Sequence, residues 1–163
     1  MSEKVLVAYA TRMGATATIA AAIGAELRRA GHEVEVHEVT DVKAVSEYGA
    51  VVLGSALYFG RWRPEAVRFL RSHARELGSR PVWLFHSGPI GPGRDAAQKV
   101  PSDVARLAAK IGAPPVKTFS GNLQPDTAAG RLAHRARVDT MVGDARDWPQ
   151  IRTWSDEIAS ALS

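Results

Sequence analysis

The chain contains no cysteine, which excludes disulfide bonds, thiolate metal sites and cysteine nucleophiles together. It also lacks any apolar stretch long enough to cross a bilayer. The first residues lead directly into a strand-like run and do not resemble a signal peptide. With 163 residues, 45% hydrophobic and 23% charged, the chain has the composition of one globular domain. We therefore expect a single domain over residues 1–163 and a cytoplasmic location.

Several catalytic motifs are missing as well. The five histidines show no metal-ligand spacing, so we predict no metal site. Ser87 does not lie in a Gly-x-Ser-x-Gly elbow, and no partner for a hydrolase triad is identifiable. The loop after the first predicted strand has neither the Gly-Lys-Ser/Thr of a P-loop nor a dinucleotide-binding glycine pattern. The sequence thus predicts no catalytic side chain.

The charge balance is basic, with a formal net charge of +4 and a sequence pI near 9.8. Such a balance fits an anionic partner, such as nucleic acid, anionic lipid or an acidic protein, and equally fits an arginine-rich surface without one. No nucleic-acid reader motif is present, so we predict no nucleic-acid partner. A peripheral membrane contact stays open.

What is present is an alternation of strand-like and helix-like segments. We expect strands near residues 4–10, 33–39, 50–54, 82–85 and 116–119, and helices near 16–30, 64–77, 102–111 and 149–162. This order predicts right-handed crossovers and a parallel sheet with helices on both faces. The stretch from 121 to 147 has little periodicity, and we interpret it as a functional loop or a locally helical segment.

Three loops leave the carboxyl ends of predicted strands, over residues 11–16, 55–63 and 86–93. Ligands of open parallel sheets bind at this edge. In the first loop, Gly14 lets the backbone approach a ligand, and the hydroxyls of Thr11 and Thr16 can bind phosphate oxygens. The helix that follows would direct its positive N-terminus at the same point. From spacing alone, the loop is either a phosphate site or a plain turn capped by Thr16.

The segment Tyr9-Ala10-Thr11-Arg12-Met13-Gly14-Ala15-Thr16 resembles the FMN-phosphate signature of flavodoxins. Ala8 departs from that pattern, which usually has a larger apolar residue there. The resemblance implies a flavodoxin-like, doubly wound five-stranded parallel sheet of order 2-1-3-4-5, with helices on both faces. It also implies FMN as cofactor. The phosphate would be held by Thr11, Arg12, Met13, Gly14, Ala15 and Thr16.

The other two loops lie where flavodoxins hold the isoalloxazine ring. One side of the ring would be lined by Ser55, Ala56, Leu57, Tyr58, Phe59, Gly60 and Trp62, and the other edge by Ser87, Gly88 and Gly91. Tyr58 and Trp62 offer aromatic faces for stacking. For Phe59 we favour packing onto the adjacent helix. The third loop lacks the aromatic residue that many flavodoxins have there.

The C-terminal region, from Gly143 to Trp154, is similar to the end of the menaquinone-dependent protoporphyrinogen oxidases of the flavodoxin-like type. Those proteins also have an insertion after the fifth strand, which corresponds to residues 122–142. The resemblance implies an FMN-dependent oxidoreductase that oxidises protoporphyrinogen in heme biosynthesis, with a quinone as acceptor. Basic residues of the insertion would meet propionates or the inner face of the membrane, or would simply be solvated.

Two alternatives to this enzyme remain. One is a non-enzymatic electron carrier, against which the arginines after the second loop argue, since carriers surround the flavin with acidic residues; these arginines are Arg61, Arg63, Arg68, Arg71 and Arg75. The other is a flavodoxin-like binding module without FMN. The phosphate loop does not distinguish FMN from a deazaflavin, and the sequence does not predict the oligomeric state.

Overall fold

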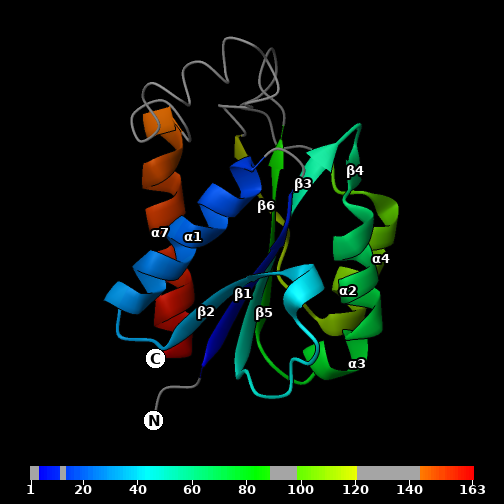
Figure 1. The fold of residues 1–163 in the computed structure, drawn as a ribbon, viewed down its shortest axis with the longest axis horizontal. Helices are drawn as coiled ribbons and strands as arrows, with labels where there is room; N and C mark the ends of the chain where they lie inside the picture. Colours follow the sequence, from blue (N-terminus) through cyan, green and yellow to red (C-terminus); the bar gives the residue numbers. More distant parts are fainter. Residues whose placement is uncertain (1–3, 12–13, 89–98, 121–143) are drawn as a thin grey trace.

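The computed structural model describes residues 4–11, 14–88, 99–120 and 144–163 (Figure 1). Strands and helices alternate along the chain. The elements are β1 (Val5–Ala10), α1 (Ala15–Arg29), β2 (Val34–Glu38), the 3-10 turn η1 (Val39–Asp41), β3 (Ala50–Tyr58), β4 (Arg61–Trp62), α2 (Pro64–Ser72), α3 (Ala74–Leu77), β5 (Val82–Gly88), α4 (Ser102–Ile111), β6 (Lys117–Ser120) and α7 (Asp144–Leu162).

The main sheet has the order β2-β1-β3-β5-β6, with all neighbours parallel. The short β4 pairs antiparallel with the end of β3. Without β4, this is the predicted order of a flavodoxin-like sheet, so the predicted fold class is confirmed. The continuous apolar runs of β1 and β3 are buried, as expected for central strands covered on both faces.

Helices form a layer on each side of the sheet (Figure 1). α1 and α7 cover one face, where Ile23, Phe85, Trp154 and Ile158 belong to one buried cluster. α2, α3 and α4 cover the other, around a second cluster that includes Leu70 and Val104. Because the sheet is enclosed between these layers, its carboxyl edge is the place where loops can form a site.

Phe85 explains why β3 has a glycine at its centre. A Cβ at Gly54 would lie 2.0 Å from the Phe85 ring, which is far inside van der Waals contact. The ring also packs edge-to-face against Trp154 of α7, with centroids 5.8 Å apart. The glycine therefore leaves room for the aromatic ring beside β3, in a position where it also contacts the helix layer.

Three predicted boundaries were wrong. β3 continues through Ser55 to Tyr58 and folds back into β4, because antiparallel pairing extends it beyond the main sheet; the predicted loop from residue 55 is a hairpin. The predicted helix over 64–77 is interrupted at His73, whose φ of −107° is not helical. The final helix begins at Asp144 and contains Pro149 in its interior. The predicted insertion at 122–142 lies outside the described residues.

Among the helices that the structure describes, none is both long enough and apolar enough to cross a bilayer.

Candidate cofactor-binding site

The strand register brings the three predicted loops to one edge of the sheet. Ala10, the last residue of β1, is the partner of Ser55 in β3. Ala56, one residue further, is the partner of Ser87 in β5. Thr11, which directly follows β1, therefore lies at the level of Ala56 in β3 and Ser87 in β5, at the carboxyl edge, which is at the top of Figure 1.

The first turn of α1 has a glycine as its N-cap residue. The helix begins after Gly14, which has a φ of 99° and is followed by 15 helical residues; as a glycine, this N-cap residue has no side chain with which to cap the first turn. A Cβ at Gly14 would meet no atom within 4 Å, so the glycine is needed for its backbone conformation and not for space. Gly14 N–H donates to Thr11 Oγ1 at 2.9 Å, which fixes the loop. An uncapped helix N-terminus fits a phosphate group.

Thr16 joins the first loop to β5. Its hydroxyl is buried and lies 2.8 Å from the Ser87 hydroxyl, across 71 residues of sequence. A hydroxyl offers one donor and two acceptor positions, so this bond leaves Thr16 able to contact a further group. The bond ties the predicted phosphate loop directly to the predicted ring edge.

Three residues of the predicted ring wall are buried within the protein. Ser55 Oγ accepts from the Arg63 backbone N–H at 2.9 Å and donates to the Ala56 carbonyl, also at 2.9 Å. Leu57 and Trp62 are cross-strand partners in the β3–β4 hairpin and belong to the core cluster under α2. These residues shape the hairpin from inside.

Tyr58 and Phe59 are the exposed aromatic residues at this edge. Tyr58 is 38% exposed and Phe59 89% exposed, and their rings meet edge-to-face with centroids 4.6 Å apart. Our expectation that Phe59 packs onto the adjacent helix was wrong. The pairing of Tyr58 with Arg61 leaves Phe59 and Gly60 as a two-residue turn with positive φ at both, 51° and 74°. This is the backbone that tight hairpins require, and it puts Phe59 at the exposed tip.

A chain of hydrogen bonds joins the hairpin to β5 and β6. Trp62 Nε1–H donates to His86 Nδ1 at 3.0 Å, and His86 Nε2 lies 3.0 Å from Thr118 Oγ1. Because the indole only donates, Nδ1 must be the acceptor and Nε2 carries the proton. Burial lowers the pKa of His86 to about 4, so the imidazole is neutral at physiological pH.

Sequence reasoning missed this chain of contacts. The only signal was a histidine at the end of the apolar run Val82–Phe85, and its partners come from β4 and β6. Of the other predicted site residues, Gly88 is buried at the end of β5. Arg12, Met13 and Gly91 lie outside the described residues.

A parallel sheet of this order, with helices on both faces, defines the flavodoxin-like class. The family model "Flavodoxin domain" matches residues 6–141. The chain belongs to the flavodoxin domain family.

Among curated proteins, the chain is 30% identical over 84 residues to the protoporphyrinogen IX dehydrogenase [quinone] of Escherichia coli K12. That match covers 50% of this chain and 46% of the relative, so the chain spans about half the length of the curated relatives it matches. A likeness over half of each chain supports a shared fold and does not by itself establish a shared reaction.

Solved structures agree on the fold. Flavodoxin 2 of Bacillus cereus is 24% identical with a TM-score of 0.64, covering 97% of both chains. Rubredoxin oxygen:oxidoreductase of Desulfovibrio gigas is 17% identical with a TM-score of 0.69, covering 98% of this chain and 36% of the other. At these identities the likeness establishes the fold alone.

Proposed function

We propose that this chain binds FMN at the carboxyl edge of its sheet, with the phosphate at the start of α1. The observation that carries the proposal is the uncapped first turn of α1, which follows Gly14 at a φ of 99° and is flanked by Thr11 and Thr16. A phosphate there would accept from backbone N–H groups and be favoured by the helix dipole.

The remaining predicted residues would hold the ring. Tyr58 and Phe59 supply exposed aromatic surface on the hairpin side, and Ser87 lies at the β5 side, bonded to Thr16. When bound, FMN supplies the electron transfer, so the chain itself needs no nucleophile. The protein residues bind the cofactor, orient it and keep the hairpin in position through Trp62 and His86.

The finer proposal is an oxidoreductase that oxidises protoporphyrinogen with a quinone as acceptor, in heme biosynthesis. It is supported by the name of the E. coli relative and by the resemblance of the C-terminal region. The positive charge of Arg61, Arg68 and Arg71 beside the hairpin also favours it over an electron carrier. A cation about 5 Å from a reduced flavin would stabilise its anionic form by roughly 3 kcal/mol at an effective dielectric near 20, which raises the potential.

The first experiment titrates the apoprotein with FMN and follows flavin fluorescence for the wild type, Thr16→Val and Thr153→Val. Thr16→Val removes the buried hydroxyl that joins α1 to β5, and we expect at least a tenfold weaker affinity. Thr153 is exposed on α7, so the same change there should leave affinity unaltered. Thermal unfolding of each apoprotein separates lost binding from lost folding.

No saturable quenching by wild-type protein would contradict FMN binding; a parallel titration with a deazaflavin then tests that coenzyme. Equal affinities for all three proteins would contradict the role of the α1 loop.

The second experiment tests the reaction. FMN-loaded protein is mixed with protoporphyrinogen and a menaquinone, in detergent and in vesicles of anionic lipid. Flavin-dependent formation of protoporphyrin supports the enzyme, and faster turnover on vesicles supports a peripheral membrane contact. Without turnover, a midpoint potential well below that of free FMN would instead indicate an electron carrier.

A further inference from the structure

A groove opens on the outer side of the β3–β4 hairpin. It has a volume of about 580 Å³ and lies between β4, α2 and the first turn of α4, elements that adjoin in Figure 1. Its lining includes three arginines, Arg61, Arg68 and Arg71, and apolar surface from Pro64, Val67 and Pro101. A volume of this size is typical of small-molecule sites.

The three arginines form no ion pair with any acidic side chain in the described part of the chain. Their neighbour Arg63 contrasts with them, because its guanidinium lies 3.4 Å from the Glu65 carboxylate. Arg68 and Arg71 are three residues apart on α2, so they share one face of the helix. Arg61 approaches from β4. Within the described residues, three guanidinium groups thus border one groove without being held in an ion pair.

The first turn of α4 borders the groove on another side. The helix has ten residues, and its N-cap, Pro101, makes no side-chain capping bond. One acidic group is present: Asp103 lines the groove, and its Oδ1 accepts from the Val104 N–H at 2.8 Å. Three arginines against one aspartate, which is already engaged with the helix backbone, leave the groove positively charged.

We propose that this groove binds a small organic molecule with an apolar body and at least two carboxylates. Guanidinium groups bind carboxylates in a bidentate manner, and the prolines and Val67 would contact the body of the molecule. Gly60 and Trp62 belong both to the groove and to the hairpin, so the ligand lies beside the proposed flavin. Its role as the substrate rests on the proposed function; its binding does not.

A series of aromatic acids tests the charge requirement. Benzoate, benzene-1,3-dicarboxylate and benzene-1,3,5-tricarboxylate share one ring and carry one, two and three carboxylates. Each is titrated into the full chain at low ionic strength, with the arginine Nε–H signals and backbone amides followed by NMR. We expect at least a tenfold gain in affinity from the first acid to the third, with shifts in residues 60–71 and 101–103. Added salt should weaken binding.

The matched variants are Arg68→Gln/Arg71→Gln in the groove and Arg75→Gln on α3. All three side chains are exposed, so the variants should fold. The groove variant should lose at least tenfold in affinity for the tricarboxylate, and Arg75→Gln should bind as the wild type does. Equal losses in both, shifts confined to the start of α1, or binding only of an acidic peptide would overturn the proposal.

FMN affinity is measured on the same proteins. Failure of the wild type to bind FMN would contradict the proposed function and leave the polycarboxylate site standing. Absence of tricarboxylate binding by the wild type, together with normal FMN binding, would contradict the polycarboxylate site and leave the proposed function standing.

Discussion

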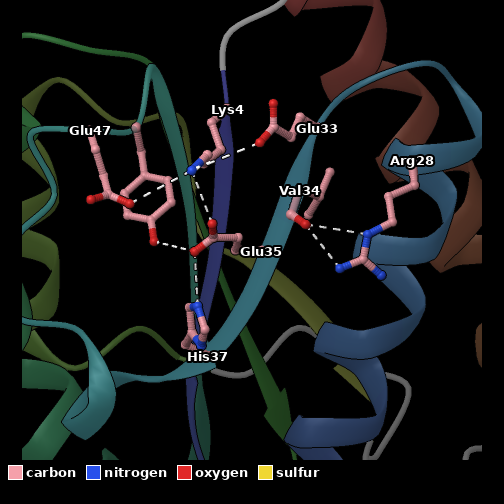
Figure 2. Close-up of polar contacts among 8 residues, drawn as sticks. Lys4, Arg28, Glu33, Val34, Glu35, His37 and Glu47 are labelled. Atoms are coloured by element: carbon pink, nitrogen blue, oxygen red, sulfur yellow. Dashed lines mark hydrogen bonds and ion pairs between the residues drawn. The ribbon is translucent and has the colours of Figure 1, made fainter.

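The charged residues at the two ends of the sheet differ in whether they form ion pairs. At the amino end, Lys4 lies between three carboxylates, 3.8 Å from Glu33, 3.1 Å from Glu35 and 3.8 Å from Glu47 (Figure 2). Glu35 also accepts from the Tyr48 hydroxyl at 2.7 Å. At the carboxyl end, Arg61, Arg68 and Arg71 have no acidic partner within the described ranges, and α1 begins without a capping side chain.

This difference separates charges that join elements of the fold from charges that are exposed to solvent. Hydrogen bonds from Tyr48, His37 and Lys4 lower the pKa of Glu35 to about 2, and Figure 2 shows Arg28 similarly engaged, with its guanidinium donating to the Val34 carbonyl. At the amino end, Lys4, Glu35 and Arg28 all have partners within the protein. At the carboxyl end, Arg61, Arg68 and Arg71 are exposed to solvent, so an anion that binds there would break no internal ion pair.

The largest expected effect concerns His86 at the carboxyl end. Its pKa is about 4 in the folded protein and near 6.5 when unfolded, so the unfolded state binds a proton first as the pH falls. The contribution of neutral His86 to the free energy of unfolding is fully present above about pH 6.5. It decreases by roughly 3 kcal/mol as the pH falls to about 4. Urea unfolding at pH 7 and pH 4.5 measures this loss.

The control for that prediction is His86→Gln, which keeps one donor and one acceptor but does not titrate. The variant should be less stable at pH 7 and should lose far less stability on acidification. If both proteins lost the same amount, the buried histidine would not be the cause.

A smaller loss of stability is expected on replacing either of the glycines that flank α1. Gly14 and Gly31 have similar φ values, 99° and 102°, and a Cβ added at either would meet no atom within 4 Å. Alanine at either should destabilise the fold by about 1 kcal/mol because of backbone strain. Only Gly14→Ala should weaken FMN binding. Equal FMN affinities for the two variants would contradict a special role of Gly14 in binding the cofactor.

The smallest change in stability is expected for a substitution at the amino end of the sheet. Glu35→Gln should lower stability by less than about 1 kcal/mol at pH 7, because the carboxylate is partly exposed and screened. Since its folded pKa is depressed, the wild type should lose this advantage as the pH falls from about 4.5 towards 2. Chemical unfolding at both pH values, with exposed Glu157→Gln as control, measures it; a change in FMN affinity would contradict a purely structural role.

The sequence predicted the central strands because such strands are short, continuous apolar runs, such as Val5–Ala10. Their order in the sheet followed from the resemblance to flavodoxins, and the structure confirms it. It did not predict the β3–β4 hairpin, because β4 has only two residues and no periodicity can reveal it. The buried link from Trp62 through His86 to Thr118 depends on register between three strands. The arginines after the second loop were evident, but their meeting with the start of α4 is a tertiary feature.

Phe59 combines a positive φ with an exposed ring, and the two properties would be selected differently among variants of this protein. A bulky residue with positive φ costs on the order of 1–2 kcal/mol, and its exposed ring recovers little of that by burial. In a library screened by heat alone, asparagine or glycine should replace it, since both suit such a turn. In a library screened for redox turnover, phenylalanine should persist. The identity recovered at this one position would therefore reveal which of the two pressures acted on the population.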